Sequence, residues 1–268
     1  MITAQIKSHI KETEFKKQFS RYLYLKNYQN YFKDKRVLDL ACGLGYGSYF
    51  IKKYLGAKEV IGVDLDKSAI DYAKNNFKCS GLKFFCDSSY DFSKFKEYNH
   101  YFSTVVTFET IEHVTSPSLF LKELNCLSKK SSIFFLSTPN KDLVSPYVAY
   151  PIYRYHLKEF KDLELKKFIK ECNFKIVSFR YEITEKSLFI KFRTAICYFF
   201  SFLKLKIMSR FLELIFYNLK RVINYNSKYL EVKKKIIKEY RIDDLNNFFS
   251  NKLGLNESAG GFFIVFKK

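Results

Sequence analysis

The feature that most constrains the fold is an apolar strand that runs into a glycine-dense turn and then into a helix. It reads Arg36-Val-Leu-Asp-Leu-Ala-Cys-Gly-Leu-Gly-Tyr-Gly-Ser48. Glycines in such a turn let the backbone approach a ligand where a Cβ atom would collide with it. This order of elements is typical of α/β proteins with a parallel sheet, whose ligands bind at the carboxyl ends of the strands.

Apolar runs and helical patterns alternate through the first two thirds of the chain. This alternation predicts a Rossmann-like, seven-stranded, mostly parallel sheet with helices on both faces. Strands are expected at 36–40, 59–63, 82–86, 102–108, 132–137, 175–181 and 261–267, and helices at 47–55, 67–76, 116–127 and 158–171. Asp66 is the expected N-cap of the second helix.

Four segments follow from this pattern. Residues 1–33 form an N-terminal helical segment, 34–186 the core domain, 187–258 a helical insertion, and 259–268 the last strand of the core sheet. The insertion is amphipathic, and residues 187–268 carry 16 basic and 6 acidic side chains. Under a third of the chain therefore holds half of the net charge of +20.

Size and composition exclude several classes. A chain of 268 residues with 47% hydrophobic content can bury a sizeable core and is not disordered. The six cysteines form no CxxC pair and the four histidines are far apart in the sequence, so the spacing predicts neither a metal site nor a disulfide framework.

The sequence also predicts a cytoplasmic protein. Residues 1–17 mix charged and apolar residues and lack the apolar core of a signal peptide. The longest uncharged apolar run, 194–203, is about half of the roughly 20 residues needed to span a bilayer.

Acidic residues recur at the expected ends of successive strands. Asp39 lies late in the first strand, Asp64 ends the second 21 residues after Gly43, and Asp87 with Ser88 follows the third. A carboxylate about 20 residues past the glycines can accept hydrogen bonds from ribose hydroxyls. Asp39 suits a ligand with a positively charged amine and would repel a pyrophosphate. Ser48 also departs from the dinucleotide fingerprint, which requires Gly or Ala at that position.

These residues, together with the segments 108–114 and 137–140, resemble the class I S-adenosylmethionine-dependent methyltransferases. More narrowly, Arg21-Tyr22, residues 41–48, Phe108-Glu-Thr-Ile-Glu-His-Val114 and Ser137-Thr-Pro-Asn140 resemble bacterial members that act in capsule or O-antigen biosynthesis. The resemblance covers about residues 20–183. Ala41 replaces the first glycine of the family pattern, and Leu44 replaces a Glu that is frequent in the subgroup.

The resemblance implies an S-adenosylmethionine site and a catalytic site. Asp39, Ala41 and the turn at Gly43, Gly45 and Gly47 would hold the methionine part, Asp64 the ribose, and Leu65, Asp87 and Ser88 the adenine. Phe108 and Glu109 would border the transferred methyl group. His113 is the first candidate for the base, because on a helical turn it would share a face with Glu109. His156, on the loop after the fifth strand, is the second.

The expected activity is methyl transfer to a small molecule or a sugar, with oxygen favoured over nitrogen as the acceptor. The chain lacks the Asn-Pro-Pro-Tyr and Asp-Pro-Pro-Tyr motifs of adenine-amino enzymes and the Pro-Cys of cytosine-C5 enzymes. The basic residues are 39 Lys and only 8 Arg, which weakens the case for nucleic acid. A nucleic-acid methyltransferase and a non-catalytic scaffold remain the alternatives.

Three roles stay open for the insertion at 187–258. It could be a substrate lid or a dimerisation arm, an interfacial helix resting on the inner face of an anionic membrane, or an arm that contacts RNA or DNA.

Overall fold

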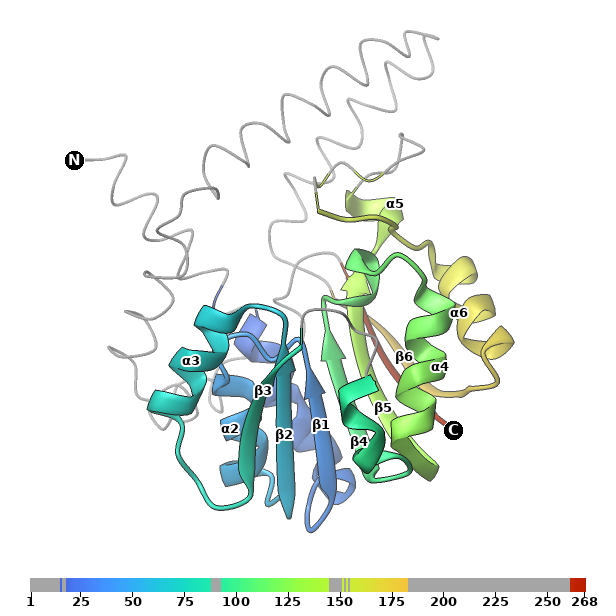
Figure 1. Cartoon of the computed structure of the whole chain (residues 1–268). Coiled ribbons are helices and arrows are strands. Elements are labelled where there is room, and N and C mark those ends of the chain that lie inside the picture. Colours follow the sequence, from blue (N-terminus) through green and yellow to red (C-terminus); the bar gives the residue numbers. More distant parts are fainter. Residues whose placement is uncertain are drawn as a thin grey trace, which may run out of the picture.

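The chain folds around a seven-stranded sheet in the order β3-β2-β1-β4-β5-β7-β6. The computed structural model describes residues 15, 18–87, 93–144, 151, 153, 155–182 and 261–268 (Figure 1). The predicted insertion, Ser88 and most of residues 1–17 lie outside these residues. None of the described helices is long and apolar enough to span a bilayer.

The elements follow one another as an alternation of strands and helices. Residues 18–24 are helical and continue into a 3-10 helix. The elements are η1 (Leu25–Tyr31), β1 (Arg36–Leu40), α2 (Tyr46–Tyr54), β2 (Glu59–Asp64), α3 (Lys67–Asn76), β3 (Leu82–Cys86), η2 (Ser93–Tyr98), β4 (Phe102–Phe108), η3 (Ile111–His113), α4 (Pro117–Leu127), β5 (Ser128–Pro139), α5 (Lys141–Val144), α6 (Asp162–Glu171), β6 (Lys175–Glu182) and β7 (Gly261–Lys267).

The predicted α/β class is confirmed, and so is the mostly parallel sheet. β1 pairs in parallel with β2 and β4, β2 with β3, and β4 with β5. β7 is antiparallel to both of its neighbours, β5 and β6. All seven predicted strands are present, and Asp66 caps α3 as expected, because its side chain accepts hydrogen bonds from the backbone N–H groups of Ser68 and Ala69.

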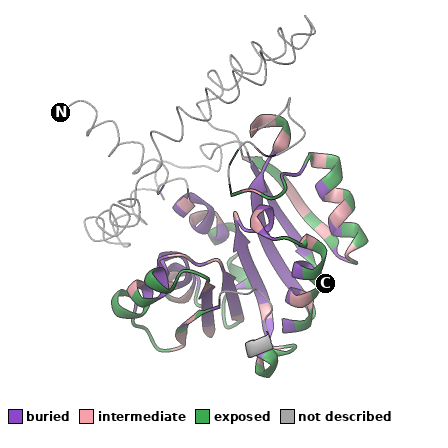
Figure 2. Ribbon diagram, turned by 45° about the horizontal axis from the view of Figure 1, so that its top comes forward, coloured by how far each residue is buried: buried purple, intermediate pink, exposed green. Residues whose placement is uncertain are grey.

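Each face of the sheet has its own apolar core, because neighbouring residues of a strand point to opposite faces. Val37 belongs to the core that includes residues of α2, α3 and the N-terminal helix, whereas Leu38 belongs to the core that includes residues of α4 and α6. Phe263 and Phe262 divide in the same way on β7. Figure 2 shows the strands buried between helices whose outer sides are exposed.

Two elements begin four residues away from their predicted starts. β5 begins at Ser128 and not at 132. The helix expected to begin at 158 begins at Asp162. The backbone N–H groups of Leu157 and Lys158 donate to the carbonyl of Glu112, which holds this stretch as a loop beside η3.

Candidate active site

The turn after β1 places its glycines for different reasons. Gly43 has a φ of +55°, and nothing lies within 4 Å of the position that a Cβ would take. At Gly45 a Cβ would lie 2.6 Å from the Cβ of Ala73, and at Gly47 one would lie 2.1 Å from the ring of Tyr22. Gly43 therefore leaves open space for a ligand, whereas Gly45 and Gly47 permit close packing within the chain.

Asp39 lies beneath this turn and is fully buried. Its carboxylate accepts a 2.6 Å hydrogen bond from Ser48 Oγ and a 3.1 Å bond from the hydroxyl of Tyr22. Burial raises the pKa of Asp39 to about 7, although both hydrogen bonds act in the opposite direction. Asp39 thus contacts the chain's own hydroxyls, and its contact with a cofactor amine stays a prediction.

Asp64, at the end of β2, is hydrogen-bonded to the segments that follow the two neighbouring strands, β1 and β3. Its Oδ2 accepts the N–H of Gly43 at 2.8 Å, and its Oδ1 accepts the N–H of Asp66 at 2.9 Å. The N–H of Asp87 donates to the Asp64 carbonyl at 3.0 Å. The side chain of the adjacent Leu65 is half exposed. It therefore offers an apolar surface on which a planar adenine ring can pack.

These features fit S-adenosylmethionine. Open space at Gly43, a carboxylate at the end of β2 and an exposed apolar side chain at Leu65 lie together at one edge of the sheet. Of the predicted cofactor residues, the structure brings Ala41, Gly43, Asp64 and Leu65 to this edge, with Asp87 buried next to them.

The end of β4 carries Phe108 and Glu109. The ring of Phe108 packs against Tyr22 and Phe263, with centroids 5.1 and 5.6 Å apart. Glu109 has a φ of +51°. Its Oε1 lies 3.3 Å from Nη2 of the buried Arg21 and accepts a 2.9 Å hydrogen bond from Ser137 Oγ.

The predicted helical turn from Glu109 to His113 is not present. Glu109 is left-handed and Thr110 is non-helical, so η3 begins only at Ile111. His113 instead lies beside the carboxylate of its neighbour Glu112, whose Oε1 is 3.9 Å from His113 Nε2. Sequence reasoning had not singled out Glu112, because one glutamate in a short turn carries no periodic signal.

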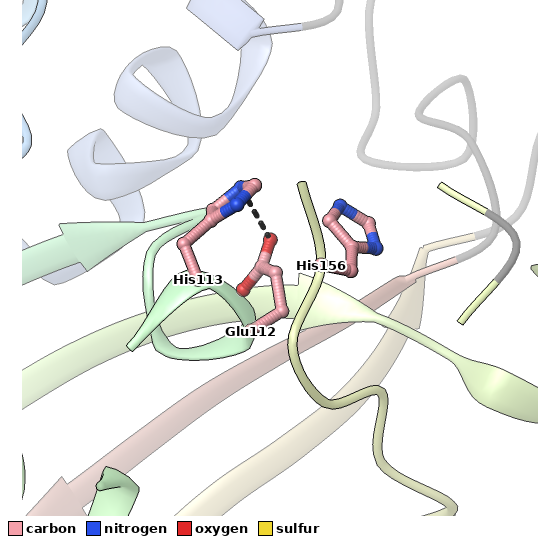
Figure 3. Close-up of side chains that lie close together, drawn as sticks. All are labelled: Glu112, His113 and His156. Carbon is pink, nitrogen blue, oxygen red and sulfur yellow. Dashed lines mark ion pairs between the residues drawn. The ribbon is translucent and has the colours of Figure 1, made fainter. Parts of the chain in front are cut away.

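Glu112, His113 and His156 form a cluster above the carboxyl end of β4. One potential ligand atom from each lies within 4.8 Å of the others. Figure 3 shows that Glu112 and His113 come from one turn and His156 from a separate loop beside it. The two imidazole rings are 4.9 Å apart and meet nearly at right angles. The two histidines proposed as candidate bases are therefore neighbours.

A second layer of hydrogen bonds orients both rings. Nδ1 of His113 donates to the carbonyl of Tyr155 at 2.8 Å. Nδ1 of His156 donates to Oε1 of the buried Glu159, also at 2.8 Å. A neutral imidazole with its proton on Nδ1 has a free lone pair on Nε2. Sequence reasoning missed Glu159, and a His-x-x-Glu spacing is too common to reveal such a role.

Burial shifts two pKa values in the cluster. It raises the pKa of the fully buried Glu112 well above the usual value, and nearby Glu109 adds to this effect. Oε2 of Glu112 accepts a 2.9 Å hydrogen bond from Thr138, whereas its Oε1 has no hydrogen-bond partner among the described residues. Burial also lowers the pKa of His113, which favours the neutral ring.

Strand order, glycine turn and strand-end carboxylates together define a class I methyltransferase fold. Comparison with known proteins agrees. Residues 32–198, more than half of the chain, match the methyltransferase domain family, and the chain belongs to that family. S-adenosylmethionine is accordingly its cofactor.

Individual relatives agree with this assignment. A ubiquinone biosynthesis O-methyltransferase of Pelagibacter ubique is 32% identical over 159 residues, which are 58% of this chain and 64% of the relative. A probable S-adenosylmethionine-dependent methyltransferase of Mycolicibacterium smegmatis is 26% identical over 147 residues, 52% of each protein. The chain thus spans about half to two thirds of these relatives.

Among solved structures, an S-adenosylmethionine-dependent methyltransferase from Archaeoglobus fulgidus shares the fold. Its TM-score is 0.52 at 18% sequence identity, and the alignment covers 92% of each chain. The match therefore supports the fold and leaves the acceptor to be argued from the site.

Proposed function

We propose that this protein transfers a methyl group from S-adenosylmethionine to a hydroxyl of a small molecule, with a sugar of a cell-surface glycan as the favoured acceptor class. The observation that carries the proposal is the cluster of Glu112, His113 and His156 at the end of β4. β4 is the parallel neighbour of β1, so the cluster and the glycine turn share one edge of the sheet.

When bound, S-adenosylmethionine would supply an activated methyl group on a sulfonium, with the sulfur as the leaving group. The chain's residues position the reactants and exclude water. Gly43, Asp64, Leu65 and Asp87 hold the cofactor, and Phe108 and Glu109 border the methyl position.

A hydroxyl is a weak acid and must lose its proton during the transfer, so an oxygen acceptor needs a proton-accepting group. His113 is the first candidate and His156 the second. Both have a free Nε2 lone pair, because each Nδ1 donates its proton to an oxygen. Glu109, held by Arg21, contributes a fixed negative charge next to the acceptor position.

Two kinds of likeness support the acceptor class. The ubiquinone enzyme among the relatives is named as an O-methyltransferase, which favours oxygen over nitrogen. The motifs at 21–22, 41–48, 108–114 and 137–140 support a glycan acceptor through their resemblance to capsule and O-antigen enzymes. We further propose a cytoplasmic enzyme whose segment 187–258 serves as a lid or dimerisation arm.

The first test separates an enzyme from a scaffold. Calorimetry with S-adenosylmethionine should show binding to the wild type and at least tenfold weaker binding to Asp64→Ala, since Asp64 holds the N–H of Gly43 and faces the ribose position. Asp71→Ala, an exposed position on α3, is the matched control. A wild type that binds no cofactor would support the scaffold instead.

The second test identifies the acceptor. Radiolabelled methyl transfer is measured over nucleotide sugars, polyhydroxylated aromatic compounds, small amines and total RNA. We expect label in an ether product of a small hydroxylated acceptor. Label confined to RNA, or to an amine, would contradict the proposal.

A further inference from the structure

The geometry of Glu112, His113 and His156 points to a divalent metal site, and we propose that it holds a first-row transition metal ion such as Mn²⁺ or Zn²⁺. The role of the ion in catalysis rests on the proposed methyl transfer, whereas its binding does not. Two imidazoles and one carboxylate are a donor set that such ions commonly accept. The three potential ligand atoms lie within 4.8 Å of one another.

The first argument is that one ligand atom is buried and unsatisfied. Oε1 of Glu112 is buried and has no hydrogen-bond partner among the described residues, whereas Oε2 accepts from Thr138. Leaving a buried polar atom unpaired costs free energy, and native structures usually provide a partner. Oε1 lies on the side of His113 Nε2, 3.9 Å away, so an ion between them would be that partner.

The second argument is the arrangement behind the ligands. Histidines that bind metals usually donate the other ring N–H to a carboxylate or a backbone carbonyl, which fixes the ring and its tautomer. Here both arrangements occur: His113 Nδ1 donates to the Tyr155 carbonyl, and His156 Nδ1 donates to Glu159. Each ring is therefore held with Nε2 available as a ligand.

The third argument is that the loop holding His156 is fixed to the turn holding the other two ligands. The N–H groups of Leu157 and Lys158 donate to the carbonyl of Glu112 at 2.7 and 3.2 Å. The same two segments are thus joined by main-chain hydrogen bonds, and the ligands are brought together before any ion binds. The sequence does not reveal this site, since His156 lies 43 positions after His113.

Three protein ligands leave coordination positions open for a further oxygen. We place the acceptor hydroxyl there. A bound cation lowers the pKa of a coordinated hydroxyl, so that its proton passes to water and the oxygen is left as the nucleophile. In this arrangement His113 and His156 are metal ligands, which replaces the base role given to them in the proposed function, and the proton passes to solvent and not to a side chain.

Binding is tested on the tag-free full chain, treated with a chelator and without cofactor or acceptor. Titration with MnCl₂ should show one saturable site by calorimetry. Mn²⁺ should broaden the ring proton NMR signals of His113 and His156 and leave those of His100 sharp. His100 is the control because it precedes β4, at the opposite end of that strand from the cluster. Its ring contacts the Ser128 carbonyl there. This readout needs no variant to fold.

Variants then assign the ligands. His156→Gln and Glu112→Gln should bind Mn²⁺ at least tenfold more weakly, and His100→Gln should bind like the wild type. Glu159→Gln keeps all three ligands and should weaken binding by roughly 10- to 100-fold through the orientation of His156. An absent site in the wild type, or equal affinity in His156→Gln, would overturn the proposal.

The metal site and the methyl transfer can fail separately. If chelator-treated protein binds no Mn²⁺ and still transfers methyl groups at the full rate, the metal site is refuted and the proposed function stands. Saturable Mn²⁺ binding at this cluster without transfer to any acceptor of the panel would leave the metal site standing and contradict the proposed function.

Discussion

At the scale of single residues, Ala41 shows a conflict between sequence and backbone. It has a φ of +60°, a region in which L side chains are disfavoured and in which the family pattern has glycine. We expect Ala41→Gly to raise the free energy of unfolding by about 1 kcal/mol, because a left-handed alanine costs about that amount. Urea denaturation measures the change.

The matched control for this prediction is Ala69→Gly. Ala69 lies inside helix α3, where glycine should lower the free energy of unfolding by about 1 kcal/mol. If Ala41→Gly lowers the free energy of unfolding as Ala69→Gly does, the left-handed backbone at Ala41 does not destabilise the protein.

Asp39 makes stability depend on pH. Its pKa is about 7 in the folded protein, against about 4 in an unfolded chain. The folded state therefore keeps a proton that the unfolded state gives up, and stability falls as the pH rises from about 4 to about 7. The loss from this single group is about 4 kcal/mol.

Asp39→Asn removes this titration and keeps an acceptor for Tyr22 and Ser48. Relative to the wild type, its free energy of unfolding should rise by about 3 kcal/mol between pH of about 5 and about 8. Denaturation at both pH values measures it, with Asp71→Asn on the exposed face of α3 as the control. A constant difference between wild type and Asp39→Asn would mean that Asp39 is ionised throughout.

At the scale of elements, the cap of α3 is the clearest local signal. Oδ1 of Asp66 accepts hydrogen bonds from the N–H groups of Ser68 at 2.8 Å and Ala69 at 3.3 Å. Asp66→Ala should lower the free energy of unfolding by about 1 kcal/mol, because two N–H groups lose their partner. Thermal and urea unfolding measure it.

Asp71→Ala provides the comparison on the same helix. Asp71 is exposed in the middle of α3, and its removal should change stability by less than about 0.5 kcal/mol. A similar loss in both variants would assign the effect to charge and not to the cap.

Elements that depend on local sequence were predictable, and those that depend on distant contacts were not. All seven strands were predicted from apolar-rich runs of sequence, and their ends lie within four residues of the predicted ones. The start of α6 was wrong because the carbonyl of Glu112 captures the N–H groups of residues 157 and 158.

The candidate site divides in the same way. Asp64 and the glycines follow from spacing along one strand–turn–helix unit, which a sequence reveals directly. The pairing of Glu112 with His156 needs two loops to meet, and the burial of Asp39 needs Tyr22 from the N-terminal helix. Pattern and period carry no information about such contacts.

At the scale of the whole molecule, Phe263 of β7 links segments from both ends of the chain. It is fully buried, and its ring lies 5.1 Å from Tyr24 and 5.6 Å from Phe108. Phe263→Ala should lower the free energy of unfolding by about 4 kcal/mol through lost burial and a cavity. Because we propose that Phe108 borders the methyl position, we expect cofactor binding to weaken as well.

Val177→Ala on β6 is the control, because Val177 is about half exposed (48%) and its truncation should cost less than about 1 kcal/mol. A loss below about 1 kcal/mol in Phe263→Ala would show that β7 contributes little to the core.

The place of β7 also governs the order in which a nascent chain can fold. β7 lies between β5 and β6, yet it is made after both of them. Until residues 261–267 leave the ribosome, β6 has no strand to pair with, and the edge of β5 is open. Closure of the sheet must therefore wait until translation of this segment is complete, and a polypeptide stalled within the insertion presents an unpaired strand edge to chaperones and to other chains.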